Sequence, residues 1–193
     1  YETISNGRYP RMITGKPVGM GGSLGRKEAT GYGVIYVLKN LLREMNIPVE
    51  STTASIQGFG NVAEYAARMY TELGGKIIAV SCWNQADAKA YTFKKKSGCD
   101  IEQLAGIKDS FGGIDKEKAI ELGYEVLMGE EWIKQDVDIL IPAALENQIT
   151  PAVFTYISSK VRIICEAANG PTTPDCDALI RERGITLLPD FLC

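Results

Sequence analysis

The stretch that decides the fold is TTASIQGFGNVAEYAARMYTELGGKIIAV, residues 52–80. It begins with an apolar run at 53–57, which ends at Gly58 and Gly60. A helical pattern then continues to Leu73, and a second apolar run follows at 77–80. Strand, glycine turn, helix and strand within about thirty residues are the layout of a dinucleotide-binding βαβ unit.

Each small residue of the turn has its own physical reason. Gly58 ends the strand and can adopt backbone angles that a Cβ would forbid. Gly60 leaves room for a pyrophosphate against the main chain, and Ala63 lets helix and strand pack closely. The first helical turn then directs N–H groups and the positive dipole end at phosphates. The bare G-x-G-x-x-A pattern also occurs in ordinary turns, but the flanking strand and helix favour a nucleotide site.

Composition and charge narrow the class of protein. The chain has 193 residues, of which 45% are hydrophobic and 23% charged, enough for one substantial core. Its net charge of −3 predicts no nucleic-acid partner. No stretch approaches the roughly 20 apolar residues of a membrane span, so we expect no membrane partner either.

The sequence contains no histidine. This removes His-activated nucleophiles and His-ligated metals, so we expect no metal site and no catalytic residue here. Its five cysteines include no C-x-x-C pair, which favours reduced thiols in a cytoplasmic protein. The chain starts at Tyr1 without a signal pattern, which is compatible with a piece excised from a longer protein.

The remaining periodicities predict alternating strands and helices. A turn-rich segment, 1–25, precedes a helix that begins at Arg26 and ends before Pro48. Residues 82–125 are less regular, with short helical candidates only. We expect strands at 53–57, 76–81, 137–141, 161–165 and 185–188, and helices at 61–73, 100–105, 115–122, 130–134, from 150 onward and at 174–183. The helix at 61–73 is predicted to bury Val62, Tyr65, Ala66, Met69 and Leu73.

This alternation predicts a single α/β domain over residues 1–193. The fold class is Rossmann-like and doubly wound: a mostly parallel sheet with helices on both faces. In such sheets ligands bind outside the carboxyl ends of the strands. Three loops are expected there, and each carries one amide that could hold a ribose or a carboxamide. Asn is also common in turns, but three equivalent positions favour binding: Asn61, Asn147 and Asn169.

Seven motifs together resemble the cofactor domain of the glutamate dehydrogenases, within the wider family of glutamate, leucine, phenylalanine and valine dehydrogenases. They span nearly the whole chain and are specific as a set. They are TGKP at 14–17, GGSLGR at 21–26, ATG at 29–31, GFGNV at 58–62, PAALEN at 142–147, ANGPTTP at 168–174 and PDFLC at 189–193.

The resemblance implies reversible oxidative deamination of L-glutamate to 2-oxoglutarate and ammonia, with hydride passing to NAD or NADP. It places Thr30 and Asn61 against the cofactor, Asn147 and Asn169 near its ribose and nicotinamide, and Arg26 in a supporting role. The expected cofactor-binding residues are Arg26, Thr30, Gly58, Phe59, Gly60, Asn61, Val62, Ala63, Cys82, Ala143, Ala144, Asn147 and Asn169.

The family's catalytic lysine and aspartate, and most substrate contacts, lie in a separate domain N-terminal to this segment. We therefore expect residues 1–25 to lead in from that domain, and the chain alone to bind cofactor without turning over glutamate. The full-length protein is expected to be a homo-hexamer. Alternatives are a leucine, phenylalanine or valine dehydrogenase, or a non-catalytic nucleotide-sensing module.

The sequence leaves the choice between NAD and NADP open. Dinucleotide sites usually carry an acid at the end of the second strand to hold the ribose 2′-OH. That place here reads Ser81-Cys82-Trp83-Asn84, and the first acid is Asp87. The nearest cation that could attract a 2′-phosphate is Lys89.

Overall fold

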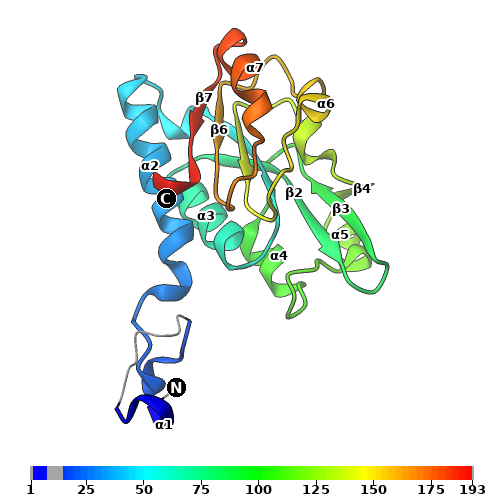
Figure 1. Ribbon diagram of the computed structural model, residues 1–193. Helices are drawn as coiled ribbons and strands as arrows, with labels where there is room; N and C mark the ends of the chain where they lie inside the picture. The colour runs from blue at the N-terminus through cyan, green and yellow to red at the C-terminus, as the bar shows by residue number, and fades with distance from the viewer. Residues whose placement is uncertain (1, 8–14, 193) are drawn as a thin grey trace.

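The computed structural model describes residues 2–7 and 15–192. Its centre is a seven-stranded sheet in the order β4-β3-β2-β1-β5-β6-β7 (Figure 1). Four of the six strand pairings are parallel, which confirms the predicted mostly parallel sheet. The strands are β1 (Thr53–Gln57), β2 (Lys76–Asn84), β3 (Lys89–Lys94), β4 (Glu125–Met128), β5 (Ile139–Pro142), β6 (Ile163–Cys165) and β7 (Thr186–Leu188).

The strand order reverses direction beside β1, because β2 pairs on one side of it and β5 on the other. A crevice opens at such a switch point, outside the carboxyl ends of the strands. The connecting helices are α1 (Glu2–Ser5), α2 (Arg26–Glu44), α3 (Asn61–Glu72), α4 (Ile101–Gly106), α5 (Lys116–Glu121), α6 (Pro151–Phe154) and α7 (Asp177–Glu182). Single 3₁₀ turns are η2 (Val18–Met20), η3 (Val49–Ser51), η4 (Glu131–Lys134), η5 (Pro174–Cys176) and η6 (Asp190–Leu192).

Helices cover both faces of the sheet, as predicted. Successive side chains of a strand point to opposite faces, so Ile139 and Ile141 join the core beneath α2 and α3. Leu140 between them joins the second core, beneath α6 and α7. Thus two apolar layers hold the sheet from either side and leave the strand ends accessible.

The α2 and α3 helices cross at very short range. A Cβ at Gly31 would lie 2.7 Å from the Val62 carbonyl oxygen and 2.8 Å from the Ala66 nitrogen. The predicted buried face of α3 is confirmed at Ala66, and Val62, Met69 and Leu73 pack partly buried against the core. The fully buried residues that the prediction missed are Ala63, Glu64, Ala67 and Tyr70. The alanines at 63, 66 and 67 allow this close packing of α3.

Between residues 82 and 128 the short helices predicted at 100–105 and 115–122 are confirmed as α4 and α5, but two strands, β3 and β4, were not predicted. β2 continues to Asn84 and turns back into β3, and β4 pairs with β3, both antiparallel. The turn at this hairpin is local: Asn84 Oδ1 accepts the Asp87 N–H at 3.0 Å, and Ala88 has φ +50°. The predicted helix at 174–183 starts as the 3₁₀ turn η5, and the helix beginning after Thr150 is the single turn α6.

Two further observations concern the ends of the molecule. Residues 15–25 and the first turns of α2 extend away from the body of the sheet (Figure 1). Residues 1, 8–14 and 193, which include part of the predicted leading segment, lie outside the described residues. Within the described ranges, no helix combines the length and apolarity needed to cross a membrane.

Candidate functional site

The glycine turn after β1 is held tightly at its first residue. Gly58 has φ +93°, a left-handed conformation that side chains disfavour. Its N–H donates to the Ser81 carbonyl at 2.6 Å. A Cβ here would lie 3.1 Å from the Ala143 carbonyl oxygen and 3.2 Å from the Ala144 Cβ. The fold itself therefore requires glycine at 58.

Gly60 is different, because nothing in the protein requires it. Its φ of −75° suits any residue, and no atom of residues 2–7 and 15–192 lies within 4 Å of a Cβ built there. Gly60 is also the N-cap of α3 and has no side chain with which to cap the first N–H groups of the helix. The short helices α4, α5 and α6 are instead capped by Asp100, Asp115 and Thr150. This helix start is thus open to an anion.

A cleft of about 390 Å³ lies beside this turn. Of the described residues that line it, Glu130 is the only one with a charged side chain. The lining residues are Gln57, Gly58, Phe59, Gly60, Ser81, Cys82, Trp83, Gln85, Phe111, Gly112, Glu130, Ala143, Ala144 and Leu145. Six of the thirteen predicted site residues, Gly58, Phe59, Gly60, Cys82, Ala143 and Ala144, are therefore gathered here.

A second hollow, of about 610 Å³, begins where the cleft ends along the turn. The neighbouring residues Asn61 and Val62 line it together with Arg26, Thr30 and the segments 15–18 and 23–28. The close α2–α3 crossing at Gly31 fixes Thr30 beside the start of α3. Four more predicted site residues thus lie on the other side of the glycine turn.

The other predicted residues differ in how they can act. The side chains of Phe59 and Ala63 are buried in the core, so only their backbone can face the turn. Asn147 and Asn169 are exposed and line neither hollow described above. Asn147 has φ +55°, which Asn tolerates better than most residues, and its N–H donates to the Gly170 carbonyl at 2.9 Å. That bond joins the loops after β5 and β6, as predicted for this edge.

Cys82 lies at the wall of the cleft but is chemically quiet. Its side chain is buried, and its sulfur accepts the Ile114 N–H at 3.4 Å. Burial raises the pKa of the Cys82 thiol to about 11, so it is protonated at neutral pH. Cys82 therefore forms part of the cleft wall and does not act as a nucleophile.

The loop at 109–113 closes one side of the cleft, and no sequence pattern indicated this position. Asp109 Oδ1 accepts the N–H groups of Phe111 and Gly113, each at 2.8 Å. A Cβ at Gly112 would lie 3.0 Å from the Phe59 carbonyl oxygen. The loop therefore packs directly on the glycine turn and leaves the Phe111 ring 82% exposed at the cleft.

Glu130 is the other residue that sequence reasoning missed. It follows β4, far along the chain from the glycine turn. Its Oε2 accepts the Ser81 hydroxyl at 2.9 Å and the Gln57 amide N–H at 3.4 Å. Only strand register brings these residues together, so no local motif could have indicated the contact.

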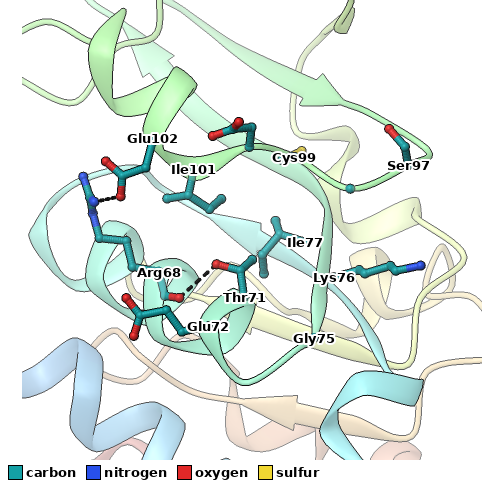
Figure 2. Close-up of a pocket in the computed structure, with 12 residues that line it drawn as sticks. Arg68, Thr71, Glu72, Gly75, Lys76, Ile77, Ser97, Cys99, Ile101 and Glu102 are labelled. Carbon is teal, nitrogen blue, oxygen red and sulfur yellow. Dashed lines mark hydrogen bonds and ion pairs between the residues drawn. The ribbon is translucent and has the colours of Figure 1, made fainter.

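Another hollow of about 610 Å³ lies at the opposite end of the sheet, where β2 begins (Figure 2). Arg68 of its lining pairs with Glu102 and also with Glu64 of its own helix. Figure 2 shows Lys76 pointing away from the Arg68–Glu102 pair. Among the described residues, no three His, Cys, Asp or Glu side chains are grouped to hold a metal ion.

Comparison with known proteins agrees with this geometry. The family described as glutamate/leucine/phenylalanine/valine dehydrogenase matches residues 21–193. The chain is 40% identical to the NAD-specific glutamate dehydrogenases of Peptoniphilus asaccharolyticus and Clostridioides difficile, over 93% and 100% of its length. It covers only 41% and 44% of those two proteins. The solved glutamate dehydrogenase of Plasmodium falciparum superposes with a TM-score of 0.84 at 29% identity, over 98% of this chain and 40% of that one.

Proposed function

Because this chain belongs to the glutamate/leucine/phenylalanine/valine dehydrogenase family, we propose that it is the NAD(P)-binding unit of a dehydrogenase that acts on L-glutamate. The observation that carries the proposal is the start of α3. Gly60 leaves the first helical N–H groups uncapped and faces open space where any other residue would place a side chain. A diphosphate supplies the negative charge and oxygen acceptors that such a helix start requires.

Two hollows flanking one turn support an extended ligand. We assign the adenosine half to the cleft beside Ser81, Cys82 and Ala143–Ala144. The diphosphate then meets the backbone of 58–63, and the nicotinamide half continues towards Thr30 and Asn61. Asn147 and Asn169 are assigned to the nicotinamide ribose and carboxamide side, with Arg26 in support.

A bound nicotinamide dinucleotide supplies hydride transfer; the residues of this chain bind and orient it. L-Glutamate and 2-oxoglutarate are the substrates we assign, by the names of the relatives at 40% identity. The groups that complete turnover are assigned to a separate domain, since the chain spans less than half the length of those relatives. For the whole protein we assign a homo-hexamer.

A cytoplasmic location is part of the proposal. Four cysteines, Cys82, Cys99, Cys165 and Cys176, are buried and outside any disulfide. Buried thiols without disulfides are typical of proteins kept in a reducing compartment.

Trp83 gives a direct test, because it lines the cleft while the other tryptophan, Trp132, is buried in the core beneath α6 and α7. When NADH binds to the chain, Trp83 emission should be quenched. The fluorescence of the bound NADH should rise, because Trp83 transfers energy to it. Trp83→Phe should lose that signal while calorimetry still detects binding. Mixing the chain with L-glutamate and NAD should yield no NADH. Absence of calorimetric binding by the unsubstituted chain, or turnover of glutamate by it, would contradict the proposal.

A further inference from the structure

The position that usually holds the ribose carries no acid on its own strand. The last four residues of β2 are Ser81-Cys82-Trp83-Asn84, and the hairpin turn follows directly. Yet a carboxylate does reach this place, from Glu130 beyond β4. A group supplied by another segment has thus taken up the location that the dinucleotide fingerprint leaves vacant.

The carboxylate is held by a row of buried polar side chains. Gln57 of β1 pairs with Ser81 of β2, and Ser81 pairs with Thr92 of β3. All three are buried, at 2%, 0% and 0% exposed. Directly paired residues share one face of a sheet, so the three side chains lie side by side. Polar groups in a sheet interior are costly unless they are bonded, and each of these bonds Glu130 or its neighbours.

Thr92 fixes the backbone on both sides of Glu130. Its hydroxyl donates to the Gly129 carbonyl at 2.9 Å and accepts the Glu131 N–H at 3.0 Å. The Gly129 N–H also donates to the Ala90 carbonyl at 2.8 Å. With Ser81 and Gln57 holding Oε2, the side chain is oriented as well as the backbone. This is the support a preorganised binding group needs.

Both partners of the Gln57–Glu130 hydrogen bond keep an oxygen that can accept a further hydrogen bond. Within residues 2–7 and 15–192, both hydrogen bonds to Glu130 reach Oε2, which leaves Oε1 for a ligand. Gln57 Oε1 is buried at the same place and has no partner among the described residues. Two acceptors at one wall of the cleft suit a ligand that presents hydroxyl donors.

We propose that Glu130 accepts the adenosine ribose hydroxyls and excludes a 2′-phosphate, so that the site prefers NAD over NADP. This rests on the proposed function. A phosphate at the 2′ position would lose the hydroxyl donor and meet a like charge. No described lysine or arginine lines the cleft to offset that charge. Lys89, the cation named from the sequence, pairs with Asn84 across the hairpin and does not line the cleft, and Lys116 is paired with Asp87.

The test compares NADH with NADPH by calorimetry on the chain and two variants. The unsubstituted chain should bind NADH at least tenfold more tightly, a difference of about 1.4 kcal/mol. Glu130→Gln keeps the size of the side chain and an acceptor for Ser81 but removes the charge, so the preference should fall to about threefold or less. Glu131→Gln, the matched control, loses a surface pair with Lys134 and should retain the full preference.

The outcomes separate the two proposals. If neither dinucleotide binds the unsubstituted chain, the proposed function fails. If NADH binds but NADPH binds as well or better, or if Glu130→Gln keeps the tenfold preference, the role of Glu130 is overturned. A second probe pair locates the effect without relying on the variants: 5′-AMP should bind at least tenfold more tightly than adenosine 2′,5′-bisphosphate. Equal binding of those two nucleotides would also overturn it.

Discussion

The two ends of the central sheet treat their polar groups in opposite ways. Where β1 and β5 begin, Asp138 accepts the Thr53 N–H at 2.9 Å and its hydroxyl at 2.7 Å, and lies 3.3 Å from Arg162. Where β1 ends, Gly60 leaves a helix start uncapped and Gln57 Oε1 has no partner among the described residues.

This difference separates stability from function within one fold. Polar groups that are bonded within the chain, as Asp138 is, lower the free energy of the folded chain by themselves. At an end with unmatched polar groups, this stabilisation comes only when a ligand supplies the hydrogen-bond partners. Binding sites are where proteins depart from optimal local structure. The comparison therefore predicts which substitutions change unfolding and which change binding.

The largest effect is expected at Gly31, a glycine that the fold requires. Gly31→Val would place side-chain atoms within 3 Å of Val62 and Ala66 backbone atoms. Overpacking of this kind costs about 3 kcal/mol, a fall of roughly 6–12 °C in Tm for a chain of this size. Gly106→Val, whose Cβ meets nothing within 4 Å, is the control in thermal unfolding. Equal melting of both variants would show that the α2–α3 crossing is not tight.

A smaller loss is expected at Asp138. Burial by itself would raise the pKa of Asp138, but the Thr53 hydrogen bonds and the charges of Lys160 and Arg162 lower it below 3.8. Asp138→Asn should cost about 2 kcal/mol at pH 7 in urea unfolding, with NADH binding unchanged.

The pH dependence of that loss tests its cause. Because folding lowers this pKa, the stabilisation is complete above the ordinary aspartate value of 3.8 and is lost as pH falls through the lowered one. The difference in unfolding free energy between the unsubstituted chain and Asp138→Asn should therefore shrink from pH 7 to about pH 3. A difference that stays constant with pH would contradict a carboxylate role.

Gly60→Ser should separate binding from stability. Ser is a favoured N-cap, and the β-region angles of residue 60 suit it, so Tm should hold or rise. Its hydroxyl would occupy the N–H groups of α3, so NADH affinity should fall at least tenfold, about 1.4 kcal/mol. Gly58→Ser is the comparison variant. It should lower both Tm and NADH affinity, because the backbone φ of residue 58 is +93°. Unchanged NADH affinity in Gly60→Ser would remove the main support for the diphosphate site.

The smallest effect is expected in the hollow of Figure 2. Glu102 pairs with Arg68, but its side chain is 73% exposed. Exposed pairs contribute less than about 1 kcal/mol. Glu102→Gln should therefore leave NADH affinity unchanged and shift Tm by no more than a few degrees. A large loss of NADH affinity would mean that both ends of the sheet take part in binding.

Local sequence predicted the features that depend on neighbouring residues. The β1–α3 unit and the strands β5, β6 and β7 lie within two residues of the predicted positions, and β2 starts at its predicted residue but ends three residues later, at Asn84. Gly58 is left-handed, as a strand-ending glycine should be. These features follow from backbone sterics and apolar runs, which a short window contains.

Features set by packing between distant segments were not predictable in this way. Ala63 and Ala67 of α3 are fully buried by packing between segments, and a pattern of large apolar residues does not reveal such alanine positions. β3 was missed because its buried positions include the polar Thr92, whose partners are Gly129 and Glu131. Glu130 meets Ser81 only through the register of three strands, which no single stretch specifies.

The most direct test is an NMR titration of the ¹⁵N-labelled chain with NADH, in which backbone amide shifts are followed residue by residue. We expect the largest changes at Gly58–Ala63 and at Ser81, with little change at Gly98–Ile101 in the opposite hollow. Saturating NADH that leaves the amides of Gly58–Ala63 unmoved, or that shifts the opposite hollow instead, would contradict this expectation.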